Sequence, residues 1–234
     1  MSPVLCYEEV TFLASYPDPH LVTTRHIRHV PFWKWFPSTD PVAAPVARLC
    51  ILREDLYLET MALTEESIPS LDRNGVPWRT MYFWRNSVRT LLEIRSALQE
   101  LKSNDEFLSS LSNQPEQFRK AFEKLDEKIR ASHEFLKDTR NEIGGHVGHQ
   151  PVKMALANMD MDRKALIELG PTIAESHYKF AGELVVETLL RKVPYENRET
   201  YLSEKLGMTA ELTEALHAID IILLAYVDAR RLMD

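Results

Sequence analysis

The sequence MYFWRNSVRTLLEIRSALQEL, residues 81–101, carries the clearest structural pattern of the chain. Its apolar side chains recur at intervals of three, four or seven positions, and charged side chains such as Arg85, Arg89 and Glu93 stand between them. The residues of this stripe are Met81, Trp84, Val88, Leu91, Leu98 and Leu101. Such spacing is that of one face of an α-helix, so we predict a long amphipathic helix that begins after Gly75-Val76-Pro77.

A second apolar stripe follows Pro115 and a short helical segment at 104–114. Its members are Phe118, Phe122, Leu125, Ile129, Leu136 and Ile143, which together span about seven helical turns. Two long amphipathic helices with a short connection bury their stripes most simply against each other. We therefore predict a long antiparallel helix hairpin as the centre of the fold.

Weaker patterns predict further helices on both sides of this hairpin. Residues 43–63 suit a first helix that begins late because of Pro45, and residues 180–190 suit one that stops near Pro194. Thr209 is placed to cap a last helix, which carries an apolar stripe and ends in Arg230-Arg231. Because glycine is scarce and no repeat has a fixed period, we expect an all-α bundle of four or five helices.

Residues 1–41 differ from the rest and are predicted to be an N-terminal arm or strand-like extension, with the helical bundle domain at 42–234. Clustered prolines, among them Pro31 and Pro37, disfavour a helix there. The segment RHIRHVPFWKWFP, residues 25–37, interleaves basic and aromatic side chains. Its aromatic rings either cover a hydrophobic surface of the bundle or stack on nucleic-acid bases.

Composition limits the classes of function. A net charge of −7 argues against a protein that coats nucleic acid through an overall positive field, although a local basic pocket is compatible with it. Two cysteines favour a reducing compartment, and the longest apolar run, 221–227, is far shorter than the roughly 20 residues that span a bilayer. We expect a cytoplasmic protein without a membrane segment. Common phosphate-loop, hydrolase and zinc patterns are absent from the sequence.

The passage TRNEIGGHVGHQP, residues 139–151, ends the second predicted helix and holds three of the seven glycines. Within it, Arg140 is followed directly by Asn141 and, six positions on, by His146, which a small residue precedes. This arrangement resembles the motif of the HEPN superfamily of helical-bundle proteins. The longer string LKDTRNEIGGHV resembles HEPN proteins of the abortive-infection type, and the resemblance covers roughly residues 78–150.

The resemblance implies a metal-independent endoribonuclease that serves as a toxin or in phage defence, with Arg140, His146 and Asn141 as catalytic residues. The chemistry suits these residue types. Arg140 keeps its charge and can bind phosphate oxygens in a fork, while a histidine exchanges protons near neutral pH. Asn141 can orient the substrate or the histidine. Neither a metal nor another cofactor is expected.

The resemblance also implies partners. RNA would be the substrate, and we expect His149, Arg85 and Arg89 to bind it. A homodimer would bring two motifs together in one cleft, and a toxin would have a neutralising protein partner. No acidic residue is uniquely placed to support the histidine, and Glu93 on the partner helix is one candidate.

The hypothesis has a structural condition. On an unbroken α-helix, residues six positions apart point about 120° away from each other, so Arg140 and His146 would diverge. Gly144 and Gly145 weaken the helix between them, and a kink there would let His146 turn back toward Arg140.

Other interpretations stay open. The bundle is alternatively a non-catalytic module that binds RNA, a nucleotide or a partner protein. In the simplest interpretation, Arg140 is a cation at a helix C-terminus and the glycines merely end the helix. A metal site is a further alternative, built either on Glu142 with the nearby histidines or on the Glu-x-x-His pair Glu214 and His217.

Overall fold

The computed structural model describes residues 7–11, 24–28, 32–64, 76–144, 148–159, 162, 167–169, 171, 177–178 and 180–231. Most of them are helical and pack around one hydrophobic core, which confirms the all-α bundle. The strands in this part of the chain form two antiparallel pairs, β1 (Tyr7–Thr11) with β2 (Thr24–Arg28) and β3 (Ile167–Glu168) with β4 (His177–Tyr178). Among the described helices, none combines the length and apolar character needed to cross a membrane.

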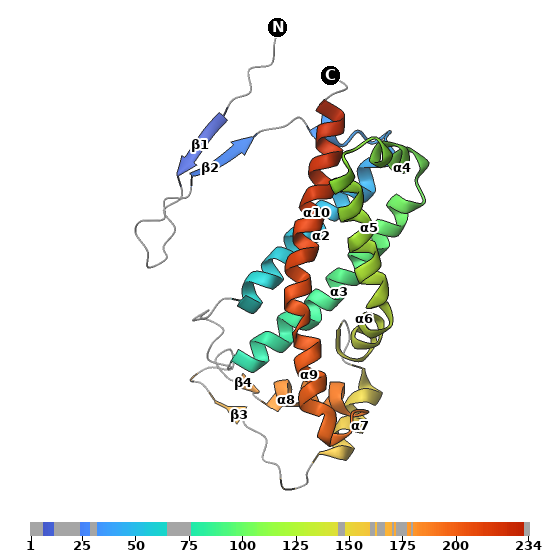
Figure 1. The fold of residues 1–234 in the computed structure, drawn as a ribbon. Helices are drawn as coiled ribbons and strands as arrows, with labels where there is room; N and C mark the ends of the chain where they lie inside the picture. Colours follow the sequence, from blue (N-terminus) through green and yellow to red (C-terminus); the bar gives the residue numbers. More distant parts are fainter. Residues whose placement is uncertain are drawn as a thin grey trace.

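The helices follow one another along most of the chain. They are α1 (Phe32–Trp35), α2 (Ala43–Thr64), α3 (Val76–Lys102), α4 (Asp105–Ser112), α5 (Glu116–Ala131), α6 (His133–Thr139), the π-helix η2 (Arg140–Gly144), α7 (His149–Asn158), α8 (Phe180–Leu190), the 3-10 helix η4 (Tyr195–Asn197), α9 (Arg198–Leu206) and α10 (Met208–Arg231). Figure 1 shows α10 running along the bundle, where it contacts both α2 and α5. Helix α3 packs against α2 and also against α5 and α6.

The predicted hairpin is present, because contacts between its arms run in opposite directions along the chain. Lys102 of α3 pairs with Asp126 of the second arm at 2.7 Å. Arg95, seven residues before Lys102, contacts His133, seven residues after Asp126, also at 2.7 Å. The second arm, however, is not one helix, since Ser132 ends α5 and precedes α6. The predicted stripe is nevertheless buried at Phe122, Leu125, Ile129, Leu136 and Ile143.

Proline does not delay the first long helix as expected. Helix α2 begins at Ala43, and Pro45 is its third residue. A first-turn residue needs no intrahelical partner for its backbone N–H, so proline is tolerated there. The start is also stabilised by Asp40, whose side chain accepts a hydrogen bond from the backbone N–H of Val42 at 2.8 Å.

The C-terminal third contains more helices than the sequence pattern predicts. Helix α8 has the expected bounds, but α7 and α9 are not expected from the pattern, so four or five helices is too few for the described chain. Helix α10 begins at Met208, so Thr209 lies inside it and is not its cap. Gly207 alone separates α9 from α10, and its N–H donates to Ser203 O at 2.8 Å.

The N-terminal stretch reaches the bundle through its aromatic segment. The expectation that proline excludes a helix there is wrong for one turn, α1. The ring of Phe36 stacks on Tyr226 of α10 at 5.8 Å between centroids, and the Tyr226 hydroxyl donates to Trp35 O at 3.1 Å. Trp33, by contrast, is 76% exposed. Covering of the bundle is therefore confirmed for Phe36 and not for Trp33.

Candidate functional site

The helix that carries the motif changes its hydrogen-bonding pattern at Arg140. Helix α6 ends at Thr139, and Arg140–Gly144 continues as the π-helix η2, in which each turn is wider than in an α-helix. Thr139 and Ile143 are 2% and 1% exposed, so they anchor this wide turn in the core. Single π-turns are rare and frequently lie at functional sites. The α-helical hydrogen-bonding pattern therefore gives way to a π-turn at Arg140. The turn of His146 back toward Arg140, which the functional hypothesis requires, lies outside the described residues and stays a prediction.

Arg140 and Asn141 face solvent from this turn. Both side chains are exposed, although the residues on either side of the pair contact the interior of the protein. Within the described part of the chain, no side-chain hydrogen bond or ion pair engages either of them. A guanidinium and an amide group on consecutive residues are thus accessible to an anionic ligand.

Glu142 ties the turn to α8. Its Oε1 atom accepts from Arg191 Nη2 at 2.5 Å and lies 3.3 Å from Lys192 Nζ. Partial burial would raise the pKa of Glu142, but the hydrogen bond and charge of Arg191, with a smaller effect of Lys192, hold that pKa below its ordinary value. Arg191 is itself anchored, since its Nη1 donates to Thr188 O at 2.6 Å. The ion pair therefore fixes the backbone that presents Arg140 and Asn141.

The sequence pattern does not single out Arg191 and Lys192. The available signal is a pair of adjacent cations directly after the predicted helix at 180–190. Cations at that position are common because they stabilise the negative end of a helix, so the pattern does not indicate a partner. Only the packing of α8 against η2 shows that Arg191 binds Glu142.

Of the two histidines in residues 139–151, one lies among the described residues and the other does not. His146 lies outside them, so the predicted approach of His146 to Arg140 stays a prediction. His149 is the first residue of α7, and its side chain is exposed. It follows Gly148, which has an extended backbone and precedes the new helix.

The two predicted binding arginines of α3 lie near different helices. Arg85 sits over the ring of Tyr82, 5.3 Å from the centroid, and borders a cavity of about 30 Å³ together with Gly182 of α8. Arg89 is exposed and lies near Glu59 on α2, where burial raises the pKa of Glu59 and the charge of Arg89 only partly opposes that rise. Arg85 is therefore close to the helix that holds η2, whereas Arg89 is close to α2.

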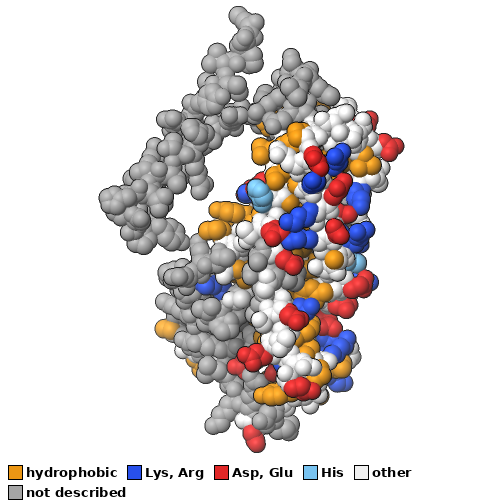
Figure 2. Space-filling model, viewed as in Figure 1, with side chains coloured by type: hydrophobic (Ala, Val, Ile, Leu, Met, Phe, Trp, Pro, Cys, Tyr) orange, Lys and Arg blue, Asp and Glu red, His pale blue; other side chains and the backbone are white. Residues whose placement is uncertain are grey.

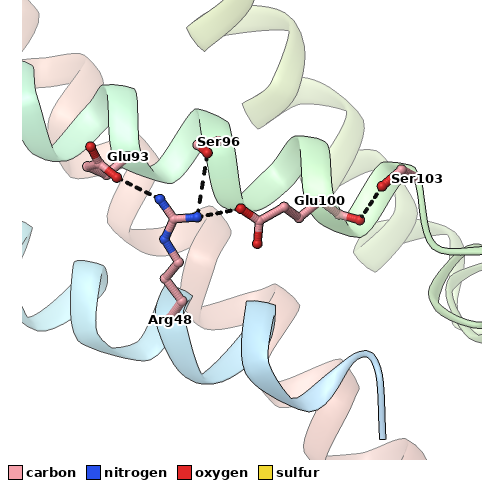
Figure 3. Close-up of polar contacts among 5 residues, drawn as sticks. All are labelled: Arg48, Glu93, Ser96, Glu100 and Ser103. Carbon is pink, nitrogen blue, oxygen red and sulfur yellow. Dashed lines mark hydrogen bonds and ion pairs between the residues drawn. The ribbon is translucent and has the colours of Figure 1, made fainter.

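Glu93 has a different partner from the histidine expected for it. Figure 3 shows Arg48 of α2 between two carboxylates of α3, with Glu93 at 2.6 Å and Glu100 at 2.5 Å. Ser96 lies 3.5 Å from the same guanidinium. Glu93 thus joins α2 to α3, and this contact gives no support to a role in positioning a histidine.

The carboxylates of both metal hypotheses are also engaged by cations. Glu142 binds Arg191, and Glu214 of α10 binds Lys128 and lies 3.5 Å from Lys124. Across the described ranges, no group of three or more His, Cys, Asp or Glu side chains is gathered as metal ligands would be. These ion pairs give Glu142 and Glu214 a structural role.

The junction between α6 and α7 therefore presents Arg140, Asn141 and His149 to solvent, while Glu142 anchors it to α8. A function can be inferred from the chemistry of these groups, which is cationic, hydrogen-bonding and capable of proton exchange. Comparison of the chain with family models, characterised proteins and solved structures finds no match.

Proposed function

We propose that this protein is a metal-independent endoribonuclease of the HEPN type that acts through Arg140 and His146. The observation that carries the proposal is the interrupted helix, which presents Arg140 and Asn141 to solvent from a turn anchored by Thr139, Ile143 and the Glu142 ion pair. An anchored turn supports catalysis because reactive groups act best when their positions are fixed before the substrate binds.

The chemistry follows from the residue types. The 2′-oxygen of a ribose attacks the adjacent phosphorus, the bond to the 5′-oxygen breaks, and the products are a 2′,3′-cyclic phosphate and a 5′-hydroxyl. One group must accept the proton of the 2′-hydroxyl, and another must protonate the leaving oxygen. Two copies of His146 in a dimer cleft would divide these tasks. Arg140 would oppose the negative charge on phosphorus, and Asn141 would orient the substrate.

We further propose a homodimer, a cytoplasmic location and a role as a toxin or in phage defence with a neutralising protein partner. The dimer is part of the mechanism, because one motif supplies a single histidine and the reaction needs both an acid and a base. The low cysteine count supports a reducing compartment. His149 and Arg85 are candidates for substrate contacts, since they lie at the junction with α7 and beside α8. Arg89 stays a weaker candidate.

The test is incubation of purified protein with labelled RNA in the presence of a chelator. We expect cleavage that leaves 2′,3′-cyclic ends, a loss of at least about a thousandfold in His146→Ala, and a comparable loss in Arg140→Ala. Lys120→Ala is a matched control, because it removes one exposed cation of α5 that pairs with Glu116 of the same helix. Its cleavage rate should equal that of the wild type.

Two outcomes would contradict the proposal. Cleavage that the chelator abolishes would indicate a metal-dependent enzyme. If no tested RNA is cleaved, but RNA or a nucleotide binds saturably and this binding needs Arg140, the non-catalytic binding module would be favoured. The oligomeric state, measured by light scattering, should be a dimer, and an active monomer would exclude the shared cleft.

A further inference from the structure

A second group of cations surrounds a hollow between α3 and α5, away from the motif in sequence. The hollow has a volume of about 330 Å³. It is lined by Arg95, Gln99 and Lys102 from α3, by Ser103 directly after α3, and by Asp126 and Arg130 from α5. Both helices are amphipathic, and these polar residues lie where their solvent-facing sides meet.

The hollow carries an excess of positive charge. Its one carboxylate, Asp126, is 13% exposed and pairs with Lys102 at 2.7 Å. Arg95 Nη1 contacts the ring of His133, 2.7 Å from Nδ1 and 3.0 Å from Nε2. No carboxylate pairs with Arg95 or with the exposed Arg130 among the described residues. The chain as a whole has a net charge of −7, and Figure 2 shows acidic and basic side chains interspersed over the coloured part of the visible face. Two guanidinium groups without a carboxylate partner therefore give this hollow a local positive charge that is open to an anionic ligand.

We propose that this hollow binds a backbone phosphate of the RNA strand whose cleavage is proposed above. Arginine suits the task because its planar fork donates two parallel hydrogen bonds to a phosphate group. The amide of Gln99 and the hydroxyl of Ser103 add neutral donors at the same place. Phosphate contacts of this kind position a strand without reading its bases, so the hollow contributes affinity and not sequence preference.

The position of the hollow relative to the motif supports this assignment. His133, which Arg95 contacts, begins α6, and Arg140 follows its end. Residues seven apart on an α-helix lie within about 20° of the same face and about 10 Å apart along the axis. At about 3.4 Å per nucleotide of a stacked strand, that span corresponds to roughly three nucleotides. A strand held at Arg140 can thus reach the edge of the hollow at Arg95, the lining residue that contacts His133.

The inference rests on the proposed nuclease function, and its test separates the two. Binding of a fluorescent single-stranded RNA is measured at several salt concentrations with chelator present, in His146→Ala protein so that the RNA stays intact. The slope of log K against log salt should fall by about 0.7 for each arginine that Arg95→Ala/Arg130→Ala removes from a phosphate. When the salt concentration is lowered from 1 M to 0.1 M, RNA affinity increases in every variant. For each arginine removed, that increase should be about fivefold smaller than in the protein that retains both arginines.

A matched control removes the same charge from another face of α5. Lys120→Ala/Lys124→Ala changes two lysines that line a separate groove between α5 and α10, and it should leave the slope unchanged. Arg130→Ala alone guards against misfolding, because this exposed side chain makes no contact on which the core depends. It should lower the slope by about 0.7 while the melting temperature stays that of the wild type.

The outcomes are distinguishable. Equal slopes in the arginine and lysine double variants would overturn the phosphate site, even if wild-type protein cleaves RNA. A lowered slope in the arginine variants without any cleavage by wild-type protein would support the hollow as an RNA contact and overturn the nuclease. Titration with inorganic phosphate provides the last arm. Saturable phosphate binding that needs Arg95 and Arg130, with no change in RNA binding, would show a site for a free anion and refute the proposal.

Discussion

Replacing Arg191 by methionine removes the cation that holds η2 against α8. The guanidinium of Arg191 donates to Glu142 at 2.5 Å, and the two side chains are 5% and 19% exposed. Methionine retains much of the buried length of the side chain, so the main change is electrostatic. The carboxylate of Glu142 is then left with the more exposed Lys192, 3.3 Å away.

The expected cost in unfolding free energy follows from this environment. Removing one partner of a fully buried ion pair costs about 3–5 kcal/mol. Glu142 keeps contact with water and with Lys192, so we expect about 2 kcal/mol at neutral pH, near the value for a hydrogen bond to a charged group. For a chain of this size, that loss corresponds to a fall in Tm of roughly 4–8 °C.

The effect should depend on pH with a definite sign. Partial burial raises the pKa of Glu142, but Arg191 and Lys192 more than offset this and hold the pKa below 4.5. A carboxyl with a depressed pKa contributes stability above its unfolded pKa and loses it as the pH falls through the folded pKa. The difference between wild type and Arg191→Met should therefore be largest near neutrality and shrink below pH 4.5.

Urea unfolding at neutral pH and again well below pH 4.5 measures this difference. Lys192→Met is the matched control, because it removes the same charge at the next position from a side chain that is 70% exposed. It should cost less than about 1 kcal/mol. Equal losses in the two variants, or a difference for Arg191→Met that survives acidification unchanged, would refute the reasoning.

Three further predictions concern the helices that position the site. Burial raises the pKa of Glu59 to about 7, so the free energy of unfolding should fall as the pH rises from 4.5 through 7. At pH 8, urea unfolding should show Glu59→Gln to be more stable than wild type by about 1–2 kcal/mol, after allowance for partial exposure. Leu98→Ala should lower the free energy of unfolding by about 2–5 kcal/mol because Leu98 is 0% exposed. Leu58→Ala, at a position that is 64% exposed, should lower it by less than about 0.5 kcal/mol, and equal losses would contradict the core assignment. Arg48→Ala should lower the free energy of unfolding by about 1 kcal/mol, measured by thermal unfolding, because its two carboxylate contacts are partly exposed. The loss should be smaller in high salt, and a loss that does not depend on salt would count against this explanation.

The long helices can be predicted because their pattern is local. The stripe from Met81 to Leu101 is buried as expected, and α8 has its predicted bounds. Helices α7 and α9 escape prediction because they carry no long apolar stripe, and α7 buries one residue, Ala155. The break at Ser132 escapes it for the opposite reason, since the apolar stripe continues across it on both sides.

The candidate site divides in the same way. The sequence by itself determined the order Arg140-Asn141, the glycines that weaken the helix after them, and the long amphipathic arm on which they lie. Only the tertiary structure decided that Arg140 and Asn141 face solvent from a π-turn and that Glu142 binds Arg191, 49 positions away. It likewise brought Arg95 and Arg130 to one hollow. Helical periodicity depends on neighbours three or four residues apart, whereas the partner of a charged side chain depends on which helices pack together.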